Sequence, residues 1–393
     1  MESHSLEKPV YIVDGARTPF LKARGQRGYF AASDLAVAAG RAVLSRQPFS
    51  PEAIGEVIVG CMSPSQDEAN IGRIVGLRLG CGQTTPGWTV QRNCASGMQA
   101  IDSALKDISI GRHHLVLAGG TEAMSRSPLI FSPEMTNWFA KFSSAKTLGA
   151  RLSSLMKVRP SYLKPIIALL HGLTDPLCGF NMGQTAEQVA YRFGITRDEM
   201  DEFATRSHHL LAKAQDEHLL TTIDPIYAAN GRYFDADDGL RRDTSIAKLA
   251  KLRPNFDRKY GMVTPGNSSQ LTDGACMLLL ASEEAVKQYN LPVLGLIKDV
   301  QWSALDPKVM GLGPAVASQP LLQRNNLSLD SIDYWEINEA FAAQVLGCLK
   351  AWEDARFCKE HFSLDQPIGS IDLNRINVDG GAIALGHPVG ATG

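Results

Sequence analysis

Cys94 is the residue whose type and position best fit nucleophilic chemistry. It lies in residues 89–100, Thr-Val-Gln-Arg-Asn-Cys-Ala-Ser-Gly-Met-Gln-Ala, where an extended run gives way to small residues and then to a helical pattern. This order predicts a strand-to-helix turn, and the unpaired N–H groups of a helix start would favour the thiolate form of the cysteine. The small residues Ala95, Ser96 and Gly97 would leave room for a substrate. The alternative is that Cys94 is a small buried hydrophobic residue.

His387 is the candidate base for this thiol. It lies in residues 379–393, Asp-Gly-Gly-Ala-Ile-Ala-Leu-Gly-His-Pro-Val-Gly-Ala-Thr-Gly, a segment rich in turn-forming residues. Pro388 fixes the backbone after the histidine, and the glycines permit close approach of other groups. A histidine held in this way can take the proton of a thiol. A Cys–His pair implies thioester or acyl chemistry, because a thiolate is both a good nucleophile and a good leaving group.

Two polar segments are candidates for binding. Asn338 and Glu339 follow a predicted strand, and the sites of α/β proteins gather at the carboxyl ends of parallel strands. Alternatively, Asn338 caps the helix that follows. The polar loop 266–275 precedes the buried run 276–280, and it either hydrogen-bonds a ligand or forms a turn.

Strands and helices that alternate along the chain must position these residues. Apolar runs predict strands at 10–16, 54–59, 89–91 and 115–120, and helical spacing predicts helices at 35–44, 70–79 and 101–110. Such alternation predicts an α/β protein with a mainly parallel sheet that is covered on both faces.

The second half of the sequence repeats the plan of the first. Residues 50–60 and 328–338 both fit a capped turn, a strand and a loop, and residues 89–97 correspond in type to 377–393. We therefore predict an internal duplication with a boundary near 283–294. The expected division is a first half over 1–126 and 252–282, an inserted loop domain over 127–251, and a second half over 283–393.

The insert contains an unusual basic segment over 135–174. It has no Asp or Glu, whereas it contains six basic residues, and apolar residues recur there at near-helical spacing. This pattern suits an anionic membrane surface or an acidic partner. The alternatives are a solvated helix that covers the active site and a basic rim for a phosphate-bearing substrate.

Bulk properties exclude several classes of protein. The 393 residues carry a formal net charge of −2, which gives no sign of nucleic-acid binding. Seven cysteines without paired spacing argue against a disulfide framework, and no motif of metal ligands is present. The first ten residues contain neither a secretory signal nor a transit peptide, and no window is apolar enough to span a membrane. We expect a cytoplasmic protein.

Five segments together resemble the thiolase family. They are 93–97, 182–187, 266–275, 338–341 and 386–393, they occur in the order found in the family, and the last contains the highly specific Gly-His-Pro-x-Gly-Ala-Thr-Gly. The insert and residues 251–259 are most similar to the β-subunit of the fatty-acid-oxidation trifunctional complex and its bacterial relatives.

This resemblance implies a fold and a reaction. The fold would be a duplicated thiolase fold, in which two βαβαβαββ halves form a five-layer α-β-α-β-α sandwich with an inserted loop domain. Cys94 would be acylated by a 3-ketoacyl-CoA, acetyl-CoA would leave, and CoA would take the shortened acyl group, as in fatty acid β-oxidation. His387 would activate Cys94, and Asn338 would hold a water that completes an oxyanion site, with the Cys94 N–H in a second one.

The resemblance also implies how CoA and acyl-CoA bind as substrates, with no cofactor permanently bound and no metal. Ser269 would lie near the pantetheine, Phe256 near the adenine and Arg241 near the phosphates, while the tunnel would be lined by Met182 and Phe341. Asn181 and Gln270 stand where short-chain members often carry His and Gly, which argues against short-chain specificity.

One part of the family pattern is missing. In the family, a helix and a strand with Cys-x-Gly-Gly follow the Gly-Ala-Thr-Gly motif, and that second cysteine shuttles a proton. This sequence ends at Gly393, and no such motif surrounds the other cysteines, which are Cys61, Cys81, Cys178, Cys276, Cys348 and Cys358. We therefore expect the sequence to be incomplete at this end.

Three functions follow from these observations. The first is a degradative 3-ketoacyl-CoA thiolase, the second a biosynthetic acetoacetyl-CoA thiolase, and the third a non-catalytic CoA-binding or scaffold subunit. The resemblance further implies a homodimer or tetramer. It also suggests a complex with a hydratase/dehydrogenase subunit, and residues 135–174 suggest a peripheral membrane contact.

Overall fold

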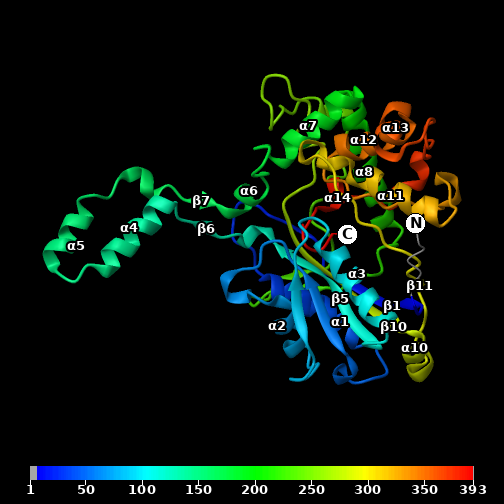
Figure 1. Ribbon diagram of the computed structural model, residues 1–393, viewed down its shortest axis with the longest axis horizontal. Coiled ribbons are helices and arrows are strands. Elements are labelled where there is room, and N and C mark those ends of the chain that lie inside the picture. The colour runs from blue at the N-terminus through cyan, green and yellow to red at the C-terminus, as the bar shows by residue number, and fades with distance from the viewer. Residues whose placement is uncertain (1–6, 393) are drawn as a thin grey trace.

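The computed structural model describes residues 7–392. The body has a sheet-containing part built mainly from the first half of the chain and a helical part built mainly from the second (Figure 1). Residues 1–6, which belong to the segment expected to carry no targeting signal, and Gly393 lie outside the described residues.

A seven-stranded sheet forms the centre of the first half. Its main path runs in the order β11 (Gly295–Leu296), β1 (Val10–Arg17), β10 (Thr272–Ser282), β5 (Leu115–Ala123), β3 (Glu56–Gly60) and β4 (Gly87–Val90), and β2 (Leu21–Lys22) pairs with β10. Only β3 pairs in parallel, with β4 and β5, whereas β10 runs antiparallel to β1 and β5. The expectation of a mainly parallel sheet is therefore wrong, because the strand after the insert enters the middle of the sheet in the opposite direction.

Helices cover both faces of this sheet, as the sequence predicts. Helices α1 (Ala32–Leu44) and α2 (Ile71–Arg78) pack on one face, where Val57 and Val59 point. Helix α3 (Ser96–Ser109) packs on the other face, toward which Ile58 points. This alternation along β3 is what a strand buried on both faces requires.

The helical part of the body combines helices from the insert with helices from the second half. Its core joins α7 (Met182–Phe193) and α8 (Arg197–Asp216) to α11 (Gly313–Arg324), α12 (Ala342–Glu353), α13 (Ala355–Phe362) and α14 (Ala382–Leu385). Shorter elements are α9 (Ile246–Leu249), α10 (Glu283–Tyr289) and the hairpin of β8 (Ile226–Tyr227) and β9 (Tyr233–Phe234).

The second sheet of a duplicated fold is only outlined within residues 7–392. There, a single parallel bridge joins Trp335 to Ile376, and β11 belongs to the first sheet. A β-ladder requires two extended segments that pair over several residues, whereas the segments around Trp335 and Ile376 pair at one residue each. They therefore do not form strands of a sheet. The local repeat is nevertheless visible, because a short 3-10 helix precedes an extended segment both at Pro51–Ala53 and at Leu329–Ser331.

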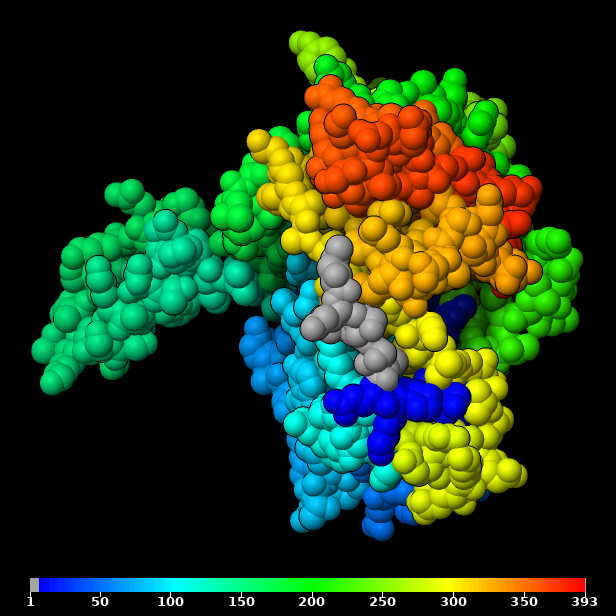
Figure 2. Space-filling view, turned by 45° about the vertical axis from the view of Figure 1, so that its right-hand side comes forward, coloured from blue at the N-terminus to red at the C-terminus, as the bar shows by residue number. Residues whose placement is uncertain are grey.

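Part of the insert forms an arm that extends away from the body (Figures 1 and 2). Strands β6 (Leu129–Ile130) and β7 (Ile166–Ile167) pair at its neck, and the arm contains α4 (Pro133–Ser144) and α5 (Leu148–Leu155), while α6 (Ala168–Gly172) follows it. Helices α4 and α5 project outward and do not cover the Cys94 turn, so the alternative of a covering helix is wrong for them. Helix α6, at the end of the basic segment, instead contributes Leu169 to the apolar cluster against which Cys94 packs. No helix of the described chain has the length and apolar character needed to cross a bilayer.

Candidate active site

Cys94 lies in the turn between β4 and α3. The helix begins at Ser96, two residues after the cysteine, and Asn93 adopts a left-handed conformation with φ of 46°. The Ser96 hydroxyl holds this turn, because it accepts from the Arg92 N–H at 2.8 Å and donates to the Asn93 carbonyl at 2.7 Å. The thiol is half-buried and packs against a small apolar cluster of Met124, Leu169 and Val389.

The protonation of Cys94 differs from the sequence expectation. Burial, followed by the negative charge of Glu122, raises the pKa of the thiol to about 11. Cys94 precedes the helix rather than lying in its first turn, so the helix start does not offset the loss of solvent. The prediction of a thiolate is wrong for this state, and Cys94 is a thiol at neutral pH.

His387 is held as a neutral base. The Thr392 hydroxyl donates to the Pro388 carbonyl at 2.9 Å, so it accepts from His387 Nδ1 at 2.6 Å. This arrangement places the ring proton on Nδ1 and leaves Nε2 unprotonated, so that its lone pair is the acceptor toward Asn338 Nδ2 and the site that can take up a proton. Burial lowers the pKa of His387 to about 4, so the ring is neutral at neutral pH. The sequence predicted the base but not the role of Thr392, which lies in the same motif.

The turn that carries His387 packs directly on the turn that carries Cys94. A Cβ added at Gly97 would lie 3.1 Å from the Gly390 carbonyl oxygen, so the two backbones are close to contact. At Gly386, φ is 109°, and a side chain there would overlap Thr272. These glycines are therefore required by the approach of the two halves.

Asn338 faces His387. Its Nδ2 lies 3.4 Å from His387 Nε2, and its Oδ1 is buried without a hydrogen-bond partner among the described residues. An unpaired buried carbonyl oxygen is a position where a water or a substrate group is needed. The following helix α12 begins at Ala342 with Phe341 at its cap, so the alternative in which Asn338 caps this helix is wrong.

Glu339, the second member of the polar pair that the sequence offered for binding, is buried and hydrogen-bonds within the protein. Its carboxylate accepts from Ser207 Oγ at 2.6 Å, from Asn377 Nδ2 at 2.8 Å and from the Ile383 N–H at 3.2 Å. Burial raises its pKa, and these donors oppose that effect. The residue thereby fixes the backbone next to Asn338.

Residues 266–271 form a loop that connects these segments, whereas residues 272–275 of the expected loop belong to β10. The Ser269 N–H donates to the Ala340 carbonyl at 2.9 Å, and the His387 N–H donates to the Gln270 carbonyl at 3.3 Å. The loop therefore lies between the segments that carry Asn338 and His387, which brings Ser269 to the edge of the site.

Three of the other residues expected to bind CoA gather beside this loop. The rings of Phe256 and Phe341 meet edge to face with centroids 5.8 Å apart. Phe256 also lies so close to Gly183 that a side chain there would overlap the ring, and Met182 is the adjacent residue.

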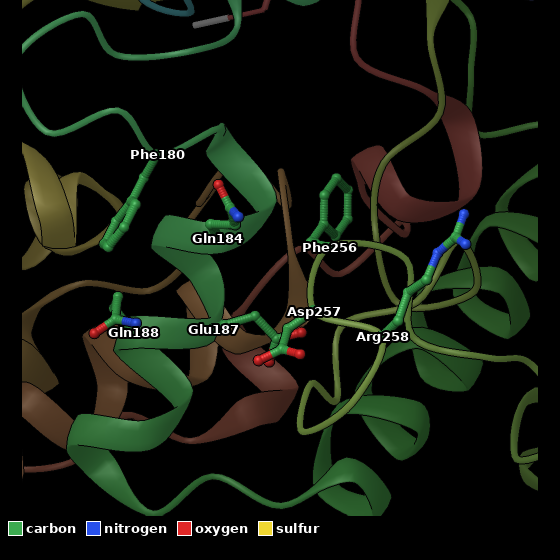
Figure 3. A pocket seen from close by; sticks show the side chains of 7 residues that line it. All are labelled: Phe180, Gln184, Glu187, Gln188, Phe256, Asp257 and Arg258. Carbon is green, nitrogen blue, oxygen red and sulfur yellow. The ribbon is translucent and has the colours of Figure 1, made fainter.

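A cavity of about 400 Å³ opens beside Phe256 (Figure 3). Its wall is formed by side chains from the start of α7 and from the loop after α9, namely Phe180, Gln184, Glu187, Gln188, Phe256, Asp257 and Arg258. The Glu187 carboxylate is already engaged within the protein, since it accepts hydrogen bonds from the N–H groups of Met262 and Val263. Arg258 is directed away from Glu187 and Asp257, and the sequence did not predict its presence here.

Arg241 stands on a neighbouring loop. Its backbone N–H donates to His208 Nδ1 at 3.2 Å, and its side chain is exposed. Two residues earlier, the Gly239 carbonyl accepts from Gln270 Nε2 at 2.9 Å. The structure thus brings the Arg241 loop to Gln270, while Arg241 does not line the cavity beside Phe256.

Comparison with known proteins agrees with this arrangement. The family models described as "Thiolase, N-terminal domain" and "Thiolase, C-terminal domain" match residues 10–284 and 291–393. The 3-ketoacyl-CoA thiolase of Aliivibrio fischeri (strain ATCC 700601 / ES114) is 37% identical over 391 residues, which cover 98% of this chain and 87% of that protein. The mitochondrial trifunctional enzyme subunit beta of Bos taurus is 35% identical over 394 residues, covering 99% and 82%.

Solved structures give the same result. Human mitochondrial 3-ketoacyl-CoA thiolase in complex with CoA matches with a TM-score of 0.83 and 34% identity, covering 99% of this chain and 89% of that one. The acetyl-CoA acetyltransferase of Bacillus anthracis matches with a TM-score of 0.83 and 34% identity, covering 99% and 90%. These matches confirm the fold class expected from the sequence. With both family models covering nearly its whole length, the chain belongs to the thiolase family.

Proposed function

We propose that the protein cleaves 3-ketoacyl-CoA with CoA, giving acetyl-CoA and an acyl-CoA shortened by two carbons, through an acyl-Cys94 intermediate. The observation that carries this proposal is the pairing of a half-buried thiol with a neutral histidine whose unprotonated Nε2 accepts a long hydrogen bond from Asn338 Nδ2. A base of this kind can accept the thiol proton at the moment of attack, so a stable thiolate is not required.

The reaction balances with these residues. The Cys94 proton passes to His387 as Sγ attacks the keto carbon, and the bond between the α and β carbons breaks. The enolate takes up this proton from His387 and leaves as acetyl-CoA. The CoA thiol then gives its proton to His387 and attacks the acyl thioester, so that Cys94 Sγ leaves and receives that proton from His387. Asn338, with a water on its Oδ1, and the Cys94 N–H stabilise the oxygen atoms on which negative charge develops.

The test is direct. Protein is mixed with 3-ketoacyl-CoA and CoA, and loss of the ketoacyl absorbance is followed. We expect turnover in the unmodified protein, an acyl adduct on Cys94 by mass spectrometry, and loss of both in Cys94→Ala. The matched control is Cys178→Ala, because Cys178 is also partly exposed but lies outside the site. Unchanged turnover in Cys94→Ala would contradict the proposal, and absence of an adduct would favour a CoA-binding scaffold.

Substrate length separates degradation from synthesis of acetoacetyl-CoA. The Asn181 side chain accepts from the Gln184 N–H at 2.9 Å and caps α7, so it is engaged in the helix start instead of being free for substrate. This supports the degradative reaction over the short-chain one. Activity that extends to longer 3-ketoacyl chains is expected, whereas a strict preference for the four-carbon substrate would favour the biosynthetic function.

We also propose that the arm binds an anionic membrane surface from the cytoplasmic side. Residues 135–174 contain no acidic side chain, and Leu148 and Met156 are 76% and 83% exposed. Apolar groups next to cations suit a layer of anionic headgroups. Sedimentation with vesicles of phosphatidylglycerol, but not of phosphatidylcholine, is expected, and Leu148→Ser with Met156→Ser should weaken it. Binding to a hydratase/dehydrogenase subunit with no binding to either vesicle would assign the arm to that partner.

The assembly is proposed to be a homodimer or tetramer, as the resemblance to thiolases suggests. Light scattering during gel filtration measures the mass in solution. A mass of one chain across a range of concentrations would contradict this part of the proposal.

A further inference from the structure

Glu122 is a buried carboxylate near the candidate active site whose role the proposed reaction does not explain. It lies near the end of β5, and its residue is 1% exposed. Within residues 7–392, no lysine or arginine forms an ion pair with it, so backbone and thiol groups supply its partners. A buried acid without a cation needs several donors to remain in place.

Its two oxygens join three segments of the chain. Oε2 accepts from the Met62 N–H at 2.9 Å and from the Gly390 N–H at 3.0 Å. Oε1 accepts from the Ser63 N–H at 3.1 Å and from Cys61 Sγ at 3.5 Å. The loop after β3 and the turn that carries His387 therefore meet at one side chain on β5.

The contact with the His387 turn is tight. A Cβ added at Gly390 would lie 2.8 Å from the Cys61 Cα and 2.9 Å from Glu122 Oε2. The carbonyl of Gly390 also lies against Gly97 in the first turn of α3. Glu122 and the Cys94 turn thus hold Gly390 from two sides, and His387 lies three residues away.

The charge of Glu122 also reaches the thiols. Burial is the larger cause of the raised pKa of Cys94, and the charge of Glu122 is the second. The same two causes raise the pKa of Cys61. The ionisable groups around this region are Cys61, Cys94, Glu122 and His387, with Glu68 acting on Cys61. Burial raises the pKa of Glu122 itself, and its N–H donors oppose that rise.

We propose that Glu122 is a positioning residue for the Cys94–His387 pair. Through Gly390 it fixes the turn of the second half against the loops of the first, and its negative charge adds to the effect of burial in disfavouring the Cys94 thiolate. Only the kinetic part of this inference rests on the proposed thiolytic reaction. The protonation part concerns Cys94 alone and can be measured without substrate.

The experiment compares Glu122→Gln with Glu122→Asp and the unmodified protein. The rate at which iodoacetamide labels Cys94 is measured against pH, with the labelled peptide identified by mass spectrometry. In Glu122→Gln the charge is removed and the shape is kept, so labelling at pH 8 should rise about tenfold and its midpoint should fall by about one pH unit. At the same time kcat should fall, because one oxygen can no longer accept hydrogen bonds.

Glu339→Gln is the matched control, since Glu339 is equally buried beside the site but is not among the charges that act on Cys94. Its labelling midpoint should equal that of the unmodified protein. If the labelling midpoint of Glu122→Gln equals those of Glu339→Gln and of the unmodified protein, the proposal is overturned. If Glu122→Gln does not fold, Glu122→Asp decides: it should lower kcat with KM nearly unchanged, and an unchanged kcat would overturn the proposal. Failure of the proposed reaction is distinguished by the absence of an acyl adduct in the unmodified protein.

Discussion

Cys94 and His387 both prefer their neutral forms, and this preference shapes how the pair can work. The thiol has a pKa of about 11 and the imidazole a pKa of about 4, in each case because burial disfavours the charged form. Proton transfer between them therefore belongs to the step in which the thiol attacks, where the developing charge is taken up by the substrate. A buried site of this kind protects the thiol from oxidation and alkylation when no substrate is present.

Burial of neutral His387 should make the protein sensitive to acid. Its pKa is about 4 in the folded state and near 6.5 when unfolded, so only the unfolded chain gains a proton as pH falls from 6.5 to 4. The free energy of unfolding should therefore fall over this window, by up to about 3 kcal/mol from this residue. Above pH 6.5 both states are neutral and the effect vanishes.

Denaturant titrations at several pH values test this expectation. In His387→Asn the decline between pH 6.5 and 4 should be smaller than in the unmodified protein. Some decline should remain, since His208 also has a pKa of about 4. Parallel curves for the two proteins would contradict the account.

The sequence predicted the turns that carry Cys94 and His387 better than it predicted the protonation of these two side chains. The turns at Cys94 and His387 could be predicted because Gly, Pro and small residues favour particular local backbone conformations. The residues that surround these side chains in the fold, and that influence their protonation, could not be predicted. Glu122 and Gly390, for example, lie 268 residues apart and meet only after folding.

At the scale of elements, the approach of β5 to the His387 turn is the closest packing in the site. A side chain at Gly120 would overlap the carbonyl oxygen of Gly390, and both groups are backbone-bound and cannot rotate away. We expect Gly120→Ala to shift the turn, to cost about 1–3 kcal/mol of stability and to lower kcat strongly. Gly149→Ala is the control, because no atom lies within 4 Å of a Cβ there. Equal kcat values for the two variants would contradict this assignment of close packing.

The start of α7 makes a second close contact, this time with Phe256. A side chain at Gly183 would overlap the Phe256 ring, so Gly183→Ala should displace that ring from Phe341. We expect KM for CoA to rise several-fold while the labelling of Cys94 by iodoacetamide is unchanged, because Cys94 packs elsewhere. Steady-state kinetics at varied CoA measure this, and an unchanged KM would argue that Phe256 does not contact CoA.

Element positions were predicted well and strand directions were not. The runs at 10–16 and 115–120 lie within observed strands and the run at 54–59 overlaps β3 from residue 56, since buried strands have a local apolar signature. The direction of β10 depends on how the chain returns from the insert, and apolar periodicity contains no information on that path. The pairing of β10 between β1 and β5 follows only from the three-dimensional structure.

At the scale of the whole molecule, the site exists only where the two halves meet. Cys94 and Ser269 come from the first half, and Asn338 and His387 from the second. A contact farther out also joins the halves, since the Arg92 guanidinium lies 4.1 Å from the centre of the Trp302 ring. Neither half alone therefore contains all four of these candidate site residues.

The arm is the part of the molecule that depends least on this arrangement. Strands β6 and β7 pair Leu129 with Ile167 and Ile130 with Ile166, so the two ends of the arm are adjacent at its neck. Within the arm, Trp138 stacks on Phe142 and donates to the Ser154 carbonyl, which holds α4 against α5 without the body. Replacing residues 132–164 by a short Gly-Ser turn should therefore leave the body folded.

We expect this deletion to keep the melting temperature within a few degrees and to keep kcat and KM for a soluble short-chain substrate. Sedimentation with anionic vesicles should be lost, because the exposed apolar residues and the basic side chains of 135–164 leave together. Calorimetry, steady-state kinetics and vesicle sedimentation on the same preparation give the three readouts. A deleted protein that still sediments with vesicles would place the membrane contact elsewhere. A large fall in kcat would instead show that the arm supports the site, which its position away from the body does not predict.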